Sequence, residues 1–393
     1  MANDRMGEIP YGTRDFLPPE AAEKRAVEAS LTALFTSWGY DGIETPVPEF
    51  LSTLTVGNGQ RIEPRMFKFF DRDNRTIALR HEMTTPIARV VASRMKDVPR
   101  PLKISYVGRV YRYEETQRGR RCEFTQAGVE FMGSDAPAAD AEVLALAVES
   151  LRQAGLRAFR ISLGQAAFIH GLMRGFALTE EEERRAKTFL EKRDLVGWRT
   201  FLDGTALPLR EKKILEKLPL LHGGREILDE AREMAVNEES LRAIDNLATI
   251  YRLLESYQAA ESVQFDLGVI RDLDYYTGMV FEAYMPGLGF PLCGGGRYDR
   301  MLADFGADCP ATGFALGVER LLLAVEQAGI SRSALKKEVY VAYAPGQEAA
   351  AIRAAQEERR AGRVTELSPA PQAEQAAKES QESKGYAALR YLK

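Results

Sequence analysis

The 393-residue sequence contains few cysteines and histidines, and this scarcity excludes several kinds of site. Its three cysteines show no CxxC spacing, and an odd number fits a reducing compartment better than a disulfide framework. Its three histidines are scattered along the chain, so we expect neither a zinc site nor any other metal. A catalytic triad is equally unsupported, because no serine or cysteine stands in a suitable context near these histidines.

Long apolar runs and a basic charge excess are also missing. No run approaches the ~18 apolar residues of a membrane span, and the N-terminus MANDRMGEIPYG lacks the apolar core of a signal peptide. The 57 acidic residues outnumber the 53 basic ones, which argues against a broad nucleic-acid surface. No GxxxxGK[ST] or GxGxxG loop is present. We therefore expect a soluble, cytoplasmic protein with no cofactor, no membrane contact and no nucleic-acid partner.

What is present indicates a large globular protein of more than one domain. A hydrophobic content of 45% and a charged content of 28% are ordinary for folded domains. We expect residues 1–330 to form one domain, interrupted at about 166–261 by a helical insertion in which the charge rises. Residues 335–393 alternate strand and helix patterns, which predicts a small parallel α/β unit.

The stretch VIRDLDYYTGMVFEAY, residues 269–284, predicts a strand, a polar turn and a second strand. Its polar groups are costly to bury without partners or a ligand, although a salt-bridged hairpin with core tyrosines is the alternative. The glycine run that follows, in FPLCGGGRY, predicts a strand ending in a tight turn. A further short strand is predicted over residues 42–47.

Polar residues also alternate on two predicted paired strands. By strand parity Arg112 shares a face with Glu114, and Gln126 shares a face with Glu130. Carboxylates and a guanidinium on one face suit the ammonium and carboxylate groups of an amino acid. The alternative is a solvent-facing side with cross-strand ion pairs.

The order of these segments resembles that in the class II aminoacyl-tRNA synthetases, and their amino-acid sequences resemble those of the histidyl-tRNA synthetase family. IPYGTRDFLP matches its entry signature, residues 106–133 resemble motif 2, and GFALGVERL resembles motif 3. RDLDYYTGMVFE, followed by CGGGRYD, resembles the histidine-specific motif. The resemblance covers about residues 1–330 and implies an α/β (α+β) fold with a class II antiparallel sheet, flanking helices, the helical insertion and the small C-terminal α/β unit.

The resemblance further implies a pocket for L-histidine. Glu82 and Thr84 would hold the α-amino group, and Gln126, Arg112 and Arg271 would lie near the α-carboxylate. At the imidazole end of the pocket, Glu130 and Tyr276 would take the ring nitrogens, and Tyr275 would form a wall.

A synthetase would also bind ATP, and the resemblance implies a residual nucleotide site at Arg120, Phe124 and Arg320. Two positions depart from the synthetase pattern. Cys122 stands where the motif 2 loop usually has arginine, and Asp272 stands where the histidine motif usually has glycine. Losing a cation and adding an anion both oppose binding of a polyphosphate.

The C-terminal residues resemble only the first part of the synthetase anticodon-binding domain. A synthetase paralogue that keeps a histidine pocket but lacks the full domain resembles the regulatory subunits of ATP phosphoribosyltransferase. That resemblance implies a non-catalytic chain that forms a homodimer through the class II core within a hetero-oligomer, a hetero-octamer in the family. It would activate a short-form catalytic subunit and convey histidine feedback in the first step of histidine biosynthesis. The alternatives are an active histidyl-tRNA synthetase with a reduced C-terminal domain, or a histidine-dependent regulator of another partner.

Overall fold

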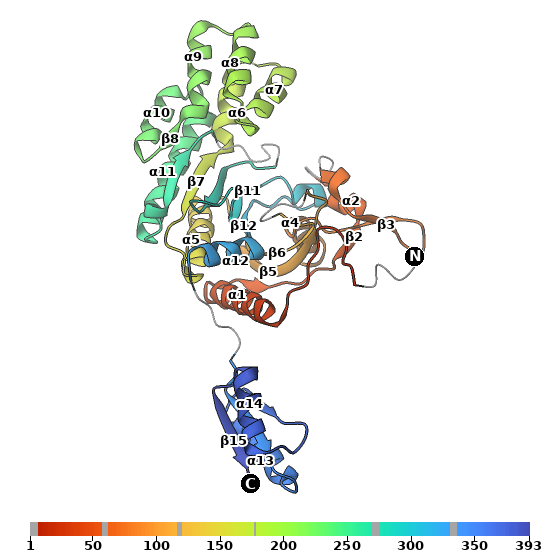
Figure 1. The fold of residues 1–393 in the computed structure, drawn as a ribbon. Coiled ribbons are helices and arrows are strands. Elements are labelled where there is room, and N and C mark those ends of the chain that lie inside the picture. The colour runs from red at the N-terminus through yellow and green to blue at the C-terminus, as the bar shows by residue number, and fades with distance from the viewer. Residues whose placement is uncertain (1–6, 57–61, 116–119, 177, 269–274, 331–335) are drawn as a thin grey trace. The chain divides into compact units, whose positions relative to one another are not determined.

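The computed structural model describes residues 7–56, 62–115, 120–176, 178–268, 275–330 and 336–393 (Figure 1). The chain divides into two compact units. Met1–Asp15 and Lys24–Ser331 form the first, and Phe16–Glu23 and Arg332–Lys393 form the second. The predicted mixed α/β fold with a class II synthetase-like sheet is confirmed.

In the described part of the chain, nine strands form the large sheet of the first unit in the order β1-β5-β6-β12-β11-β10-β7-β9-β8. Neighbouring strands run antiparallel except for the pairs β1–β5 and β7–β9, which are parallel. The strand bounds are β1 (Asp41–Gly42), β5 (Leu102–Tyr111), β6 (Glu123–Met132), β7 (Arg160–Gln165), β8 (His222–Gly223), β9 (Val263–Asp266), β10 (Met279–Tyr284), β11 (Cys293–Arg297) and β12 (Ala311–Gly317).

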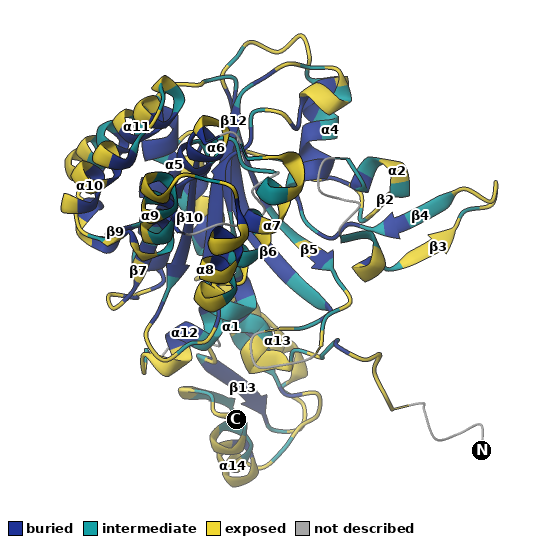
Figure 2. Ribbon diagram, turned by 90° about the horizontal axis from the view of Figure 1, so that it is seen from above, coloured by how far each residue is buried: buried dark blue, intermediate teal, exposed yellow. Residues whose placement is uncertain are grey.

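One face of this sheet, here the packed face, carries the main apolar core. On β6 the residues Ala127, Val129 and Phe131 point to this face and pack with the buried sides of α1 (Pro18–Ser37), α5 (Pro137–Gln153) and α12 (Val318–Gln327). Because strand residues alternate between faces, Gln126, Gly128 and Glu130 point to the opposite side. Figure 2 shows the central strands buried, in dark blue.

The opposite side, here the glycine face, is defined by the strand register. Residues that pair directly across neighbouring strands share a face, so the positions opposite Gln126, Gly128 and Glu130 can be followed outward through β5, β12 and β11. Six of these eight positions are glycine or alanine: Gly108 on β5, Gly313, Ala315 and Gly317 on β12, and Gly294 and Gly296 on β11; the other two, Ile104 and Tyr106, lie on β5. The sheet therefore presents a floor with few side chains on this side.

Residues 166–256 are mostly helical. Thr179 starts one of these helices with a capping box, in which its side chain and that of Glu182 satisfy each other's backbone N–H groups. The acidic run that follows lies in the first helical turn, where negative charge is favoured. The helices are α6 (Ala166–Gly175), α7 (Glu180–Glu191), α8 (Leu195–Gly204), α9 (Leu209–Lys217), α10 (Glu226–Met234) and α11 (Glu238–Ser256).

A small sheet borders the site described below. Among the described residues it contains β2 (Pro48–Phe50), β4 (Thr76–Leu79) and β3 (Lys68–Phe70), in that order. Strands β3 and β4 are antiparallel neighbours joined around Asn74, which adopts the left-handed conformation at φ 58°. Helix α2 (Leu51–Leu54) contacts β2 and β4 of this sheet, and α4 (Thr84–Arg94) contacts α2.

The second unit confirms the predicted alternation of strands and helices. Its parallel strands β13 (Val339–Tyr343), β14 (Thr365–Leu367) and β15 (Ala388–Leu392) lie in the order β14-β13-β15. Helix α13 (Glu348–Arg360) packs alanines on one side of β13, and α14 (Glu374–Lys384) packs Ala377 on the other. No helix in the described ranges of the whole chain is long and apolar enough to cross a membrane.

Two local predictions were wrong. The glycines predicted to form a turn are strand β11 in the middle of the large sheet, and the predicted strand 42–47 is limited to β1. Strand β10 is the second strand predicted in the stretch 269–284, and it pairs with β11 and with β7, a strand that the sequence did not indicate. Residues 269–274 of that stretch lie outside the described residues.

Candidate functional site

The glycine face carries a buried carboxyl group, Glu130 of β6, which is only 1% exposed. Thr84, at the start of α4, donates a hydrogen bond to Glu130 Oε1 at 2.8 Å, and the Tyr298 hydroxyl donates to Oε2. The residue opposite on β12 is Gly313, where an added Cβ would lie 2.0 Å from Glu130 Oε2. Glycine at this position is therefore what leaves room for the carboxyl group.

The pKa of Glu130 is raised to about 8, chiefly by burial and in smaller part by the nearby charge of Glu82. Hydrogen bonds from Tyr298 and Thr84 act in the opposite direction, because they stabilise the charged form. At neutral pH Glu130 is therefore mostly protonated and holds a proton that it can pass to a basic group placed beside it. An imidazole ring titrates in the same pH range.

Glu82 fixes the position of Thr84. Its two carboxylate oxygens accept hydrogen bonds from the backbone N–H groups of Thr84, at 2.6 Å, and Thr85, at 2.8 Å. These are the first N–H groups of α4, which have no partner within the helix, and a negative charge is favoured at this end. The sequence predicted Glu82 and Thr84 as site residues, and the structure brings both to the Glu130 carboxyl group.

A cluster of tyrosines surrounds the same carboxyl group. The Tyr275 ring lies 4.8 Å from the Tyr276 ring and 5.4 Å from the Tyr298 ring, measured between centroids. Gly296 makes space for Tyr276, since an added Cβ would lie 2.8 Å from the Tyr276 ring. Burial raises the pKa of Tyr275 well above 10, and the charge of Glu82 adds to this effect, so the phenol is a neutral hydrogen-bond donor.

Gln126 lies on the glycine face of β6, four residues before Glu130. It is 9% exposed, and its Oε1 atom has no hydrogen-bond partner within the described residues. A buried acceptor without a donor is costly, and a ligand ammonium or N–H group is one way to satisfy it. This observation from the structure agrees with the amino-acid ligand that the sequence predicts.

Arg112 follows the end of β5 rather than lying within it, so the parity argument that grouped it with Glu114 was wrong. Its Nε atom donates to the His81 carbonyl oxygen at 2.6 Å, and its guanidinium lies 5.4 Å from the centroid of the Phe124 ring. Burial lowers the pKa of His81 to about 4, and the charge of Arg112 contributes, so His81 is neutral at pH 7.

The residues predicted for a nucleotide are less closely grouped. Arg120 is exposed, and Phe124 lies beside Arg112. Arg320, in the first turn of α12, donates to the Pro291 carbonyl oxygen at 2.9 Å. Arg271 of the predicted histidine pocket lies outside the described residues.

Sequence reasoning missed Tyr298 and Tyr106 as members of the site. Tyr298 donates to Glu130, and Tyr106 lies on the glycine face, where it occupies the space above Gly128. The signal for Tyr298 was present in CGGGRYD, but its role depends on the pairing of β11 and β12 with β6. Such pairing between distant segments cannot be deduced from local pattern.

Proteins similar to this chain are histidyl-tRNA synthetases and their relatives. The family model described as histidyl-tRNA synthetase matches residues 12–321. A protein of Moorella thermoacetica named ATP phosphoribosyltransferase regulatory subunit is 48% identical, over 82% of this chain and 83% of that protein. One of the same name from Desulforamulus reducens is 43% identical, over 83% and 81%.

The chain belongs to the histidyl-tRNA synthetase-like family of ATP phosphoribosyltransferase regulatory subunits.

Solved structures support this family and its fold. A Bacillus halodurans structure described as an ATP phosphoribosyltransferase regulatory subunit/histidyl-tRNA synthetase has a TM-score of 0.88. It is 33% identical, and the match covers 99% of both chains. A Nostoc histidyl-tRNA synthetase, at 20% identity and a TM-score of 0.83, covers 96% of this chain and 90% of its own and shows the shared fold. Membership of this family connects the chain with histidine biosynthesis.

Proposed function

We propose that this chain is a non-catalytic subunit that assembles with a short-form catalytic ATP phosphoribosyltransferase, activates it and conveys feedback by L-histidine. The observation that carries the proposal is the buried Glu130 carboxyl group on the glycine face, with Thr84 and Tyr298 as its donors. The names of the relatives support a catalytic ATP phosphoribosyltransferase as the partner, and the groups around Glu130 support L-histidine as the ligand.

Each part of histidine has a matching group in this proposal. Glu130 and Tyr276 face the imidazole, Glu82 and Thr84 hold the α-amino group, and Gln126 lies near the α-carboxylate. The guanidinium groups of Arg112 and Arg271 pair with the α-carboxylate, a contact for which arginine is well suited. Tyr275 closes one side of the pocket.

Cys122 supports a regulatory role rather than activity as an aminoacyl-tRNA synthetase. It is buried, its thiol donates to the Glu114 carbonyl oxygen at 3.5 Å, and its backbone N–H donates to the Gly12 carbonyl oxygen at 2.9 Å. The side chain thus packs inward, where a synthetase would present a cation to the triphosphate. Without that cation, transition-state charge during histidine activation is less well stabilised.

The proposal includes the organisation of the complex. Residues 1–330 form the histidine-binding domain with its insertion at about 166–261, and residues 335–393 form a small α/β unit similar to the anticodon-binding domain. The chain forms a homodimer within a cytoplasmic hetero-oligomer, a hetero-octamer in the family. Histidine feedback then requires a coupling free energy between the two kinds of subunit, typically about 1–3 kcal/mol.

The test mixes the purified chain with a short-form catalytic subunit and measures phosphoribosyl transfer with increasing L-histidine. We expect activation by the wild-type chain and inhibition by histidine. Glu130→Ala removes the acceptor of the imidazole, so we expect at least about a hundredfold loss of histidine affinity by calorimetry. The exposed Glu326→Ala on α12 is the matched control and should bind as the wild type does.

Two results would overturn the proposal. One is a failure of the chain to activate the catalytic subunit. The other is robust histidine-dependent exchange between ATP and pyrophosphate by the chain alone, which would identify an active histidyl-tRNA synthetase. Unchanged histidine affinity of Glu130→Ala would instead show that the regulatory histidine binds elsewhere, for instance on the catalytic partner.

A further inference from the structure

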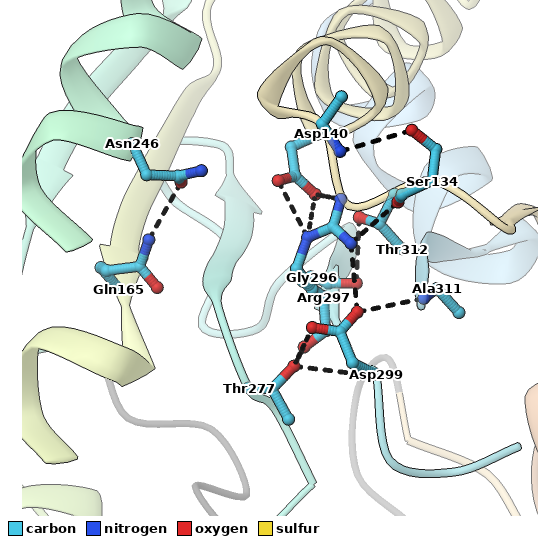
Figure 3. A network of polar contacts seen from close by, with 11 residues as sticks. Ser134, Asp140, Gln165, Asn246, Thr277, Gly296, Arg297, Asp299, Ala311 and Thr312 are labelled. Atoms are coloured by element: carbon cyan, nitrogen blue, oxygen red, sulfur yellow. Dashed lines mark hydrogen bonds and ion pairs between the residues drawn. The ribbon is translucent and has the colours of Figure 1, made fainter. Parts of the chain in front are cut away.

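A buried ion pair lies behind the tyrosines of the site, on the packed face of the sheet. Arg297 of β11 is 6% exposed and faces Asp140 of α5, which is fully buried. Arg297 Nε donates to Asp140 Oδ2 at 3.0 Å, and Nη2 lies 2.9 Å from Oδ1 (Figure 3). The Nε–H group is shared between the two Asp140 oxygens, whereas Nη2, although close to Oδ1, makes no hydrogen bond within the described residues.

The same guanidinium extends the network toward the site. Arg297 Nη1 donates to the Ser134 carbonyl oxygen at 3.0 Å and to Asp299 Oδ1 at 3.1 Å (Figure 3). The Asp299 Oδ1 atom also accepts the backbone N–H of Ala311, on β12, at 3.1 Å. Asp299 is therefore held by β11 and β12 together, and only its second oxygen is left for another donor.

That second oxygen holds Thr277. The Thr277 hydroxyl donates to Asp299 Oδ2 at 3.0 Å and accepts the Asp299 backbone N–H, also at 3.0 Å. The Thr277 backbone N–H donates to the Arg297 carbonyl oxygen at 2.8 Å. Three hydrogen bonds thus fix the residue that directly follows the two tyrosines of the predicted histidine motif.

Strand alternation connects this network to the site on the other face. In the tripeptide Arg297-Tyr298-Asp299, the two charged residues belong to the network, whereas Tyr298 between them reaches Glu130. Beside it, Gly296 provides the space in which the Tyr276 ring lies. Any shift of this strand end would move Tyr298 and Tyr276 together relative to Glu130.

We propose that the Asp140–Arg297–Asp299 network acts, through Thr277, as a positioning element that sets Tyr275, Tyr276 and Tyr298 for recognition of the imidazole ring. The proposal rests on the proposed histidine site and extends it to residues that do not touch the ligand. Thr277 is the positioning residue through which the network acts, and its hydroxyl is the group to remove.

The experiment uses the full chain with Thr277→Val, which keeps the side-chain shape but lacks the hydroxyl, and Thr277→Ser, which keeps the hydroxyl. Calorimetry with L-histidine should show about tenfold weaker binding for Thr277→Val and near wild-type binding for Thr277→Ser. Thr205→Val, in the helical segment, is the matched control. Its buried hydroxyl donates to the Leu202 carbonyl oxygen at 2.7 Å, so it should lower thermal stability without changing affinity.

Hydrogen–deuterium exchange of a peptide covering residues 275–280 separates this proposal from the proposed function. Faster exchange of this peptide in Thr277→Val, but not in Thr277→Ser, supports the positioning role even if the wild-type chain does not bind histidine. A wild-type chain that does not bind histidine would overturn the proposed function alone. Wild-type exchange and wild-type affinity in Thr277→Val would overturn the positioning role. If Thr277→Val does not fold, Asp299→Asn replaces it, with the same expected and contradicting results.

Discussion

The two faces of the large sheet are built from the same strands but bury different kinds of side chain. On β6, Ala127, Val129 and Phe131 pack into the main core, whereas Gln126 and Glu130, one position out of phase, are buried polar groups on the glycine face. One face gains stability from apolar burial, and the other gives some of it up to keep a carboxyl group away from water. The difference shows that a site can be inserted into a stable sheet without a separate scaffold.

The largest expected effect comes from weakening the packed face. Phe281 of β10 is fully buried there, and Phe281→Ala should cost about 3–5 kcal/mol of the free energy of unfolding through lost burial and a cavity. Urea unfolding followed by tryptophan fluorescence measures this, because the two tryptophans, Trp38 and Trp198, both lie in the first unit. Ala315→Gly on the glycine face is the control and should cost about 1 kcal/mol at most. Similar costs for both variants would contradict the contrast between the faces.

Replacing Glu130 on the glycine face should have a smaller effect of opposite sign, an increase in the free energy of unfolding. The pKa of Glu130 is about 8 in the folded chain and near 4.5 when unfolded, so the folded state binds more protons between these values and loses stability as pH rises. Glu130→Gln lacks this titration and should be more stable than the wild type by about 1–3 kcal/mol at pH 8–9. The gain should nearly vanish at pH 5. Urea unfolding at a series of pH values checks this, and a gain independent of pH would contradict it.

The smallest expected effect concerns ligand affinity. A protonated Glu130 can pass its proton to a neutral imidazole, which forms an ion pair without uptake or release of protons. Below the imidazole pKa of about 6.5 both groups are protonated before binding, so forming the ion pair releases a proton. Above the Glu130 pKa of about 8 neither group is protonated, so forming the ion pair takes one up. The affinity for L-histidine should therefore be greatest between these values and fall about tenfold per pH unit well outside them. A dissociation constant that stays flat from pH 6 to 9 would count against this pairing.

The contrast between the faces also explains which features the sequence could predict. Gln126 and Glu130 were placed on one face correctly, because the period of two is a local property of a strand. Glu82 and Thr84 were found through the resemblance, and the structure gives the reason for their position, since Glu82 caps α4. These features depend on residues that are near each other along the chain.

The features that were missed depend on pairing between distant segments. Glycines have little tendency to form strands, so Cys293–Arg297 indicated a turn. Only the neighbours show why glycine is needed: an added Cβ on Gly295 would lie 2.2 Å from the Gly313 carbonyl oxygen. Tyr298 was missed for the same reason, because its partner Glu130 lies 168 positions away in the sequence.

The glycine floor has a consequence for the evolution of ligand preference. A glycine has no side chain to lose, so every substitution of Gly128, Gly296 or Gly313 subtracts space from the site, and none can enlarge it. New specificity for a bulkier molecule would have to arise from the surrounding tyrosines and acids, where shortening a side chain opens room. A library that holds the floor constant and varies Tyr275 and Tyr276 would search the part of sequence space in which the pocket is able to grow.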